Sequence, residues 1–163
     1  MVDMTDKTGF TEVSRMIIEL ATERSIDSWM DLVGKVKGSF PGLETEEALD
    51  EHRNTVLDFM DKDCAICAKA DGGIVGTLLF SKETNMLCFL AVDKEYRRQH
   101  IAEKMFSYML TLMDSEKDIT VTTYRVDVPE GIPARMFYKK MGFTEGKLTE
   151  EFGSPAQEFL LKR

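Results

Sequence analysis

The sequence predicts an α/β (α+β) domain over residues 1–163, with a mixed central β-sheet of about seven strands flanked by helices on both faces. Three observations carry this prediction. About seven short segments are rich in apolar or β-branched residues, which is typical of strands. Longer segments place apolar residues three and four apart, which is typical of amphipathic helices. Two successive strands joined by a helical connection favour parallel pairing in part of the sheet.

Composition favours a soluble globular protein. Charged residues make up 31% and hydrophobic residues 43% of the chain, and the formal net charge is −8. No apolar run approaches the ~18–20 residues of a membrane span, and residues 1–10 are too acidic for a signal peptide. We therefore expect a cytoplasmic protein that does not bind membranes. The negative charge and the lack of a long basic face also argue against nucleic-acid binding.

The three cysteines argue against a disulfide framework, because an odd number leaves at least one unpaired. Cys64 and Cys67 have CxxC spacing, but an offset of three along a strand puts the two thiols on opposite faces. The chain has two histidines, His52 and His100, so a metal site is poorly supplied. We expect no bound metal, and we expect all three cysteines, including Cys88, to be buried and inert.

The N-terminal third is expected to hold a strand at 15–20 and two helices. Several capping residues at 25–28 precede the first helix, residues 38–42 break it, and Thr45 opens the second. The second helix has an acidic face. This face is either an ordinary solvated face or one wall of an acceptor pocket for cations. This face consists of Glu44, Glu46, Glu47, Asp50, Glu51, Asp58 and Asp61.

Three strands are predicted next, at 64–70, 74–80 and 86–92. Asp71-Gly72-Gly73 joins the first two as a hairpin turn. The third is a run of seven apolar residues, which we interpret as a strand buried on both faces. A charged loop follows it and leads into a helix with apolar residues at Ala102, Met105, Phe106, Met109, Leu110 and Met113.

The loop before this helix is a candidate anion site. The first turn of a helix directs free N–H groups and a positive dipole end toward the preceding loop. Residues 94–104 carry four cationic side chains and two carboxylates, although the whole chain is acidic. The phosphate-binding patterns GxxxxGK[ST] and GxGxxG are absent. An ordinary solvated turn is the alternative interpretation.

The C-terminal part predicts a strand, a helix and two closing strands. The strand at 119–126 is rich in β-branched residues, and a loop follows at 127–131. Pro133 suits the first turn of a helix that runs to about Met141, and Gly142 ends it. Closing strands at 147–151 and 157–161 flank an expected turn at 153–155.

Two motifs resemble those of the GCN5-related N-acetyltransferase (GNAT) superfamily. Residues 92–102 resemble its acyl-CoA loop, [RQ]-x-x-G-x-[GA], with Arg97 first, Ala102 last and His100 in place of the first glycine. Residues 133–143 resemble its late helix, A-x-x-[FL]-Y-x-x-x-G-F. The resemblance covers residues 64–163 well, and the N-terminal third only by the order of elements.

The resemblance implies the acyl-CoA N-acyltransferase (GNAT) fold, in which the strands before and after the central helix splay apart around the pantetheine of the cofactor. It implies acetyl-CoA as co-substrate, with its diphosphate held by backbone N–H groups of residues 98–102. A main-chain N–H of Ala91 or Val92 would polarise the thioester carbonyl. The implied cofactor-binding residues are Leu90, Ala91, Val92, Arg97, Arg98, Gln99, His100, Ile101, Ala102 and Tyr138.

The resemblance also suggests catalytic roles. Tyr138 matches the tyrosine that gives a proton to the departing CoA sulfur in many members, although it is equally a candidate for packing its helix against the sheet. Met86 stands where some members have a glutamate base, and Gly131 stands where the family often has asparagine. Three carboxylates are candidate bases by location only: Glu83, Asp127 and Glu130.

We therefore expect an N-acetyltransferase that moves an acetyl group to a primary amine by direct attack in a ternary complex. The acceptor would be a small cationic, amino-acid-like or peptide-like molecule. The alternatives are a silent acyl-CoA-binding module on the same fold and a transferase of another acyl group. Homodimers are common in the resembled family, and no feature of the sequence decides for or against one.

Overall fold

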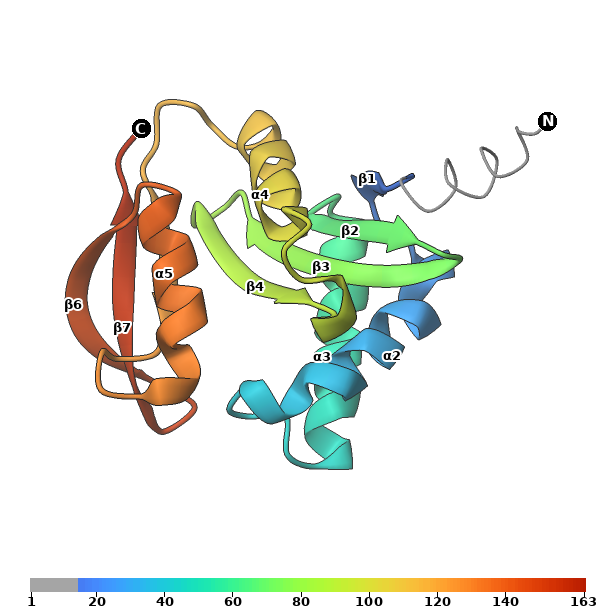
Figure 1. The fold of residues 1–163 in the computed structure, drawn as a ribbon, viewed down its shortest axis with the longest axis horizontal. Helices are drawn as coiled ribbons and strands as arrows, with labels where there is room; N and C mark the ends of the chain where they lie inside the picture. Colours follow the sequence, from blue (N-terminus) through green and yellow to red (C-terminus); the bar gives the residue numbers. More distant parts are fainter. Residues whose placement is uncertain (1–14) are drawn as a thin grey trace.

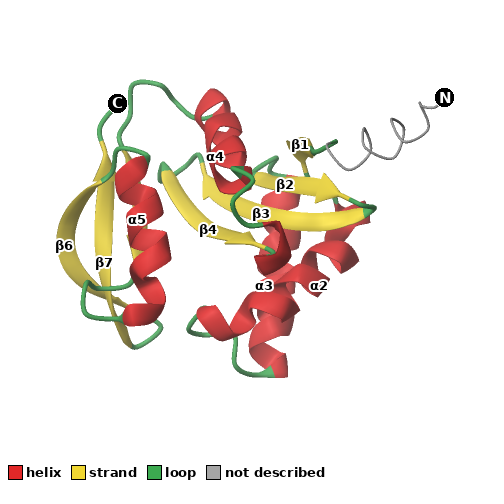
Figure 2. Cartoon of the chain, viewed as in Figure 1, coloured by secondary structure: helices red, strands yellow, loops and turns green. Residues whose placement is uncertain are grey.

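The computed structural model describes residues 15–163, so the expectation about residues 1–10 lies outside the described residues. A seven-stranded sheet with the order β1-β2-β3-β4-β5-β7-β6 forms the centre of the molecule (Figure 1). β4 and β5 pair in parallel, and the other neighbouring strands pair antiparallel. Four α-helices of the described chain flank the sheet (Figure 2). The predicted mixed sheet of about seven strands is confirmed.

The elements have the following bounds. The strands are β1 (Ile17–Leu20), β2 (Ala65–Ala70), β3 (Gly73–Ser81), β4 (Met86–Val92), β5 (Ile119–Thr123), β6 (Thr144–Glu151) and β7 (Ser154–Leu161). The helices are α2 (Ile26–Val36), α3 (Glu46–Asp61), α4 (Ile101–Leu112) and α5 (Ile132–Lys140).

The sheet separates two apolar cores. The side chains of α2 and α3 pack on one face around the fully buried Trp29, and those of α4 and α5 pack on the other face around Met105 and Phe159. Cys64 belongs to the second core and Cys67 to the first, as the strand periodicity predicts. Helices on both faces of the sheet are confirmed.

Local signals position the helices of the N-terminal part. The Thr45 hydroxyl accepts a hydrogen bond from the Ala48 N–H at 3.0 Å and caps α3. The Ser28 hydroxyl accepts one from the Ile74 N–H at 3.1 Å, which ties α2 to the start of β3. All seven carboxylate residues of the acidic face of α3 are exposed.

The interpretation of residues 86–92 as a strand buried on both faces is wrong. β4 pairs with β5 only at Met86↔Thr120 and Leu87↔Val121, and beyond these pairs the two strands diverge. Phe89 and Leu90 are therefore only partly buried. Cys88 is exposed, which also corrects the expectation of three buried cysteines. An apolar run in the sequence does not show that the neighbouring strand, β5, pairs with only two of its residues.

A β-bulge contributes to this divergence. Leu79 of β3 faces Phe89 and Phe80 faces Leu87, so Cys88 has no partner in β3. A bulge of this kind bends its strand and increases the local twist. In Figure 1, β6 and β7 accordingly stand apart at the left, while β1–β4 form the right-hand part of the sheet.

Three predicted boundaries at the C-terminal end need correction. β5 ends at Thr123 rather than residue 126, where the carbonyl of Tyr124 accepts a hydrogen bond from Arg135 instead of from a strand. β6 and β7 are longer than expected, and a two-residue turn, Phe152-Gly153, joins them. Both turn residues have positive φ, 52° and 77°. That backbone matches the right-handed twist of a hairpin, but Phe152 carries no sequence signal for it.

Candidate functional site

The loop that follows β4 is anchored at its first residue. Asp93 is 7% exposed, and its carboxylate accepts hydrogen bonds from the Glu95 N–H at 3.0 Å and from Lys35 Nζ at 3.2 Å. The Glu95 amide, together with the Lys35 ammonium, lowers the pKa of the Asp93 carboxyl below its ordinary value. The start of the loop is thus fixed to both its own backbone and α2.

The next part of the loop has an unusual backbone. Arg98 and His100 both lie in the left-handed region, with φ of 68° and 61°. Each such residue other than glycine costs roughly 1–2 kcal/mol. Residues in this conformation turn successive N–H groups toward one point and form a concave anion site. His100 is also the N-cap of α4, so the free N–H groups of that helix begin beside it.

The side chain of His100 points away from the concave anion site described above. The His100 backbone adopts the left-handed conformation, and its imidazole points outward. Its side chain is 67% exposed, and its Nδ1 lies 3.4 Å from a Glu103 carboxylate oxygen. The same oxygen accepts a hydrogen bond from Lys140 Nζ at 2.6 Å, which links the first turn of α4 to the last turn of α5.

The edge of β4 that faces away from β3 has free backbone groups. Asp93 donates its N–H to the Val75 carbonyl of β3 at 2.8 Å. Because antiparallel ladders alternate in direction, the N–H and C=O groups of Leu90 and Val92 point to the opposite edge. β5 has already diverged there. A ligand with amide groups can pair with this edge as an added strand does.

Tyr138 lies in an aromatic cluster under α5. The residue is 6% exposed, and its ring lies 5.6 Å from those of Phe137 and Phe143 and 6.3 Å from that of Phe159. Burial, reinforced by the charge of Glu151, raises the pKa of the Tyr138 hydroxyl well above its usual range. The hydroxyl therefore keeps its proton at neutral pH. This geometry is compatible with both interpretations of Tyr138, packing residue and proton donor.

On the other side of β4, several side chains meet that the sequence did not single out as functional. Cys88 lies at the bulge. Although the residue is exposed, desolvation by the surrounding protein, together with nearby Cys64 and Glu151, raises the pKa of its thiol to about 11. The ring of Phe89 lies 4.5 Å from that of Phe40 and 4.9 Å from that of His52. The three stacked rings come from β4, α3 and the segment after α2, and no motif connects them.

His52 is an α3 side chain that packs against Phe89 of β4. Its Nε2 atom is buried and has no hydrogen-bond partner among the described residues. Burial lowers the pKa of the imidazole, so it is neutral at pH 7. The acidic face of α3 points to solvent instead, as the solvated-face interpretation expects.

Where β4 and β5 have diverged, two contacts still join the part of the molecule around β1–β4 to the part around β5–β7. The Tyr124 hydroxyl donates a hydrogen bond to the Ser39 carbonyl. The ring of Phe152 lies so close to Gly42 that a Cβ there would meet it at 3.1 Å. Figure 1 shows the tip of the β6–β7 hairpin facing the segment after α2 at the lower edge.

Gly131 is required by the position of Tyr124. A Cβ on Gly131 would overlap the side chain of Tyr124. This explains why glycine stands where the resembled family often has asparagine. With Tyr124 packed against this position, no larger residue fits without a shift.

The three candidate bases named from the sequence lie in three separate parts of the structure. Glu83 is in the β3–β4 turn, Asp127 lines a pocket of about 400 Å³ with Arg125 and Arg135, and Glu130 lies in a short 3-10 turn before α5. None of them is among the groups whose charge shifts the pKa of Tyr138 or Cys88.

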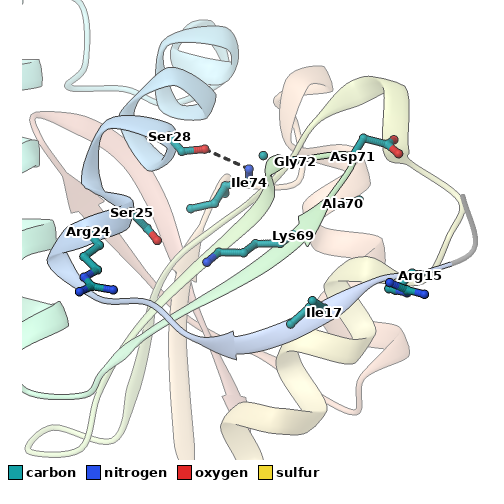
Figure 3. A pocket seen from close by; sticks show the side chains of 11 residues that line it. Arg15, Ile17, Arg24, Ser25, Ser28, Lys69, Ala70, Asp71, Gly72 and Ile74 are labelled. Carbon is teal, nitrogen blue, oxygen red and sulfur yellow. Dashed lines mark hydrogen bonds between the residues drawn. The ribbon is translucent and has the colours of Figure 1, made fainter. Parts of the chain in front are cut away.

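A pocket of about 680 Å³ lies away from all the predicted site residues. It is formed by β1, the start of α2 and the β2–β3 hairpin, and Arg15, Arg24 and Lys69 contribute cationic side chains to it (Figure 3). Lys69 is paired with Glu19 at 2.8 Å. Within residues 15–163, no cluster of three or more His, Cys, Asp or Glu side chains is arranged to hold a metal ion. No helix of this described part is long and apolar enough to cross a membrane.

Comparison with known proteins agrees with this geometry. The family model of an acetyltransferase (GNAT) domain matches residues 61–145, a little over half of the chain. This match includes β4, the loop after it, α4 and α5. No curated protein sequence matches the chain.

Solved structures share the fold at low sequence identity. A GNAT-family acetyltransferase from Bacillus cereus is 21% identical, with a TM-score of 0.72 over 92% of this chain and 99% of that chain. The PaiA N-acetyltransferase from Thermoplasma acidophilum, solved in complex with coenzyme A, is 16% identical, with a TM-score of 0.68 over 91% and 99%. Ard1 from Thermoplasma volcanium is 20% identical, with a TM-score of 0.69 over 90% and 97%.

Proposed function

Because the chain belongs to the GNAT acetyltransferase family, we propose that it binds acetyl-CoA and transfers the acetyl group to the primary amine of a small cationic or peptide-like acceptor. One observation carries the proposal. The unpaired edge of β4 continues directly into a loop with two left-handed residues at the start of α4. An extended amide chain that ends in a diphosphate matches this sequence of strand edge and anion site.

The backbone would do most of the cofactor binding. The free edge at Leu90 and Val92 would pair with the pantetheine amides, and the N–H groups of residues 98–102 would bind the diphosphate. Of the two donors expected to polarise the thioester carbonyl, the ladder direction favours Val92 over Ala91, and it adds Leu90. The proposed cofactor-binding residues are Leu90, Ala91, Val92, Arg97, Arg98, Gln99, His100, Ile101, Ala102 and Tyr138.

The reaction needs a neutral amine and a protonated leaving group. The amine nitrogen attacks the thioester carbonyl carbon, the carbon–sulfur bond breaks, and the thiolate leaves with the electron pair. Tyr138 is the proposed donor of the proton that the thiolate takes up, because burial keeps its hydroxyl protonated. Since an alkyl thiol has a pKa near 8.5, the thiolate is already a fair leaving group and the donor contributes modestly.

Ligand binding gives the first test. Acetyl-CoA at 100 times its Kd should stabilise the protein by about 2.7 kcal/mol, measured as a rise in thermal midpoint. Arg98→Glu should weaken binding by placing a negative charge at the anion site, while Lys82→Glu, an exposed change in the β3–β4 turn, should not. A folded protein with no thermal shift at millimolar acetyl-CoA contradicts the proposal.

The silent-module alternative has one observation in its favour, which is Met86 at the position of the strand glutamate. A panel of primary amines, with release of free thiol as readout, separates the two functions. Thiol release with any amine supports the transferase. Binding of acetyl-CoA without thiol release across pH 6–9 supports the silent module. Replacing acetyl-CoA with longer acyl-CoA thioesters in the same assay tests for another acyl group.

A further inference from the structure

The pocket of about 680 Å³ beside β1 has an apolar floor at the point where α2 begins. Ile17 of β1 pairs with Lys69 of β2, and Lys69 pairs in turn with Ile74 of β3. Directly opposite residues point to the same face of a sheet, and Ile74 belongs to the core around Trp29 on the α2 face. These three side chains therefore form a row on that face. Ile74 is buried but Ile17 is 47% exposed, so the row leaves an open apolar surface beyond the helix.

The polar side chains of this pocket are rich in hydrogen-bond donors. Three cations and two hydroxyls line it, and they belong to Arg15, Arg24, Lys69, Ser25 and Ser28. The Ser28 oxygen already accepts the Ile74 N–H at 3.1 Å, so its own proton is available to a ligand (Figure 3). The Ser25 hydroxyl makes no capping hydrogen bond to α2. Because guanidinium and ammonium groups only donate, a ligand that fits this set must supply acceptors.

The carboxylates near the pocket leave part of its positive charge unpaired. Asp71 is the carboxylate among the lining residues, but it accepts a hydrogen bond from the Tyr96 hydroxyl of the loop after β4. In Figure 3 the Asp71 side chain points away from Lys69. Lys69 itself is paired with Glu19 at 2.8 Å. Among residues 15–163, neither arginine of the pocket forms an ion pair, although the whole chain has a formal charge of −8.

We propose that this pocket binds a small organic anion with at least two negative charges, either a phosphate ester or a polycarboxylate. Its oxygens bind Arg15 and Arg24, since guanidinium groups match phosphate and carboxylate oxygens with paired hydrogen bonds. The two serine hydroxyls donate to the same group, and the apolar part of the ligand covers Ile17. A volume of about 680 Å³ is typical of small-molecule sites.

This site is separate from the proposed cofactor site, and the inference does not depend on the proposed transfer reaction. None of the residues proposed to bind acetyl-CoA lines the pocket. The Asp71 carboxylate contacts the loop after β4 at Tyr96, ahead of the residues proposed to bind the diphosphate. We therefore expect the anion and acetyl-CoA to bind at the same time.

The first test locates the binding of phenyl phosphate, which has a dianionic group and an apolar ring. Amide NMR spectra of the full chain are recorded during a titration, with and without millimolar acetyl-CoA. The resonances of Ser25, Ser28, Gly72 and Gly73 should shift together in both series. No shifts at millimolar phenyl phosphate, shifts confined to residues 98–102, or loss of the pocket shifts when acetyl-CoA is present overturn the proposal.

The second test compares Arg24→Gln with Lys37→Gln as the matched control. Both residues are exposed, each change removes one positive charge, and the two positions lie at opposite ends of α2. Thirteen helical residues span roughly 20 Å, which exceeds the Debye length of about 10 Å at an ionic strength of about 0.1 M. At that ionic strength Arg24→Gln should weaken phenyl phosphate binding about tenfold or more, and Lys37→Gln should match wild type. Equal affinities of Arg24→Gln and wild type overturn the proposal.

Two more variants keep this test falsifiable. Ser25→Ala should weaken binding about threefold with an unchanged thermal midpoint, because the hydroxyl makes no capping hydrogen bond. If Arg24→Gln lowers the thermal midpoint, Arg15→Gln decides, with the same loss of affinity expected. Unchanged affinity in both Arg15→Gln and Ser25→Ala overturns the proposal.

Two further probes distinguish the possible anions. Citrate that binds more tightly than phenyl phosphate identifies a polycarboxylate ligand, and the reverse order identifies a phosphate ester. Inorganic phosphate should bind several-fold more weakly than phenyl phosphate, because it does not cover Ile17. Equal affinities for inorganic and phenyl phosphate show a simple ion site and overturn the assignment of an organic ligand. A chain that binds phenyl phosphate in this pocket but no acetyl-CoA contradicts the proposed function and keeps this inference.

Discussion

The two sides of the C-terminal end of β4 are built in different ways. The side toward α4 comes from one continuous stretch, residues 92–102, and its proposed binding groups are the backbone N–H groups of that stretch. The side toward the β6–β7 hairpin is assembled from segments far apart in the sequence. Its contacts are made by side chains: Phe40, His52, Phe89, Tyr124 and Phe152.

This difference predicts how each side responds to substitution. Backbone binding depends on φ and on anchoring contacts, so most side chains of the loop can change without loss of the ligand. A junction made of side chains changes its chemistry with each residue. One fold can therefore keep a common cofactor while its acceptor changes, and the variants below test whether the two sides respond separately.

Tyr138→Phe should have the largest effect, because Tyr138 is proposed to act on the bond that lies between the two sides. The change removes only a hydroxyl. We expect kcat to fall about 100-fold, the low end for a general acid, because a thiolate leaves easily. Acetyl-CoA affinity should be nearly unchanged. Steady-state rates with a saturating amine and an acetyl-CoA titration measure both quantities. Tyr108→Phe on α4 is the control, and full turnover of Tyr138→Phe would identify Tyr138 as a packing residue.

Gly131→Ala should disturb the acceptor side alone. The new methyl group overlaps Tyr124, so Tyr124 must move and its hydrogen bond to Ser39 is lost. Overpacking of this kind costs about 1–3 kcal/mol. Urea unfolding measures the loss of stability, and KM for the amine should rise while acetyl-CoA affinity stays constant.

A double-mutant cycle identifies the cause of this effect. In a Tyr124→Gly background, the same Gly131→Ala change should be almost neutral, because the nearest obstacle, the Tyr124 Cβ, is then absent together with the ring. An undiminished penalty in that background would show that the backbone at Gly131, and not Tyr124, limits the position.

Asp93→Asn should disturb the cofactor side, and we expect a smaller effect. The amide still accepts the Glu95 N–H but loses its charge pairing with Lys35, at a cost of about 1–2 kcal/mol in unfolding free energy. The pKa of Asp93 is lowered in the folded state. Its contribution is therefore fully present above the ordinary value of 3.8 and is lost as the pH falls through the lower folded value.

Urea unfolding at pH 7 and at acid pH measures this dependence. The difference between wild type and Asp93→Asn should be largest at pH 7 and should shrink below pH 3.8. Asp114→Asn is the matched control, because Asp114 accepts the Glu116 N–H in the same local geometry but is exposed. A constant difference at all pH values would show that the charge of Asp93 contributes nothing.

The same contrast between the two sides explains what could be predicted from the sequence. The order of the elements, the Thr45 cap and the loop before α4 depend on local rules, and the loop motif is contiguous. The divergence of β4 and β5 and the exposure of Cys88 depend on a partner strand more than thirty residues away. The β6–β7 turn begins at Phe152, which has positive φ and whose ring packs against Gly42, in a segment about 110 residues earlier in the chain. No local pattern reports such contacts.

His100→Gly should have the smallest effect, and it tests the cofactor side most directly. Glycine adopts positive φ at little cost, so the strain at φ 61° is relieved. The gain is offset by the greater freedom of glycine in the unfolded chain, and the net change in stability should be about 0–1 kcal/mol in favour of the variant. Because the imidazole points outward, acetyl-CoA affinity should stay equal or improve slightly. Arg98→Gly is the matched comparison, since it relieves the same φ but removes a cation and should weaken binding, more so at low salt. A tenfold loss of affinity in His100→Gly would show that the imidazole contacts the cofactor, and binding on this side of β4 would then depend on that side chain as well.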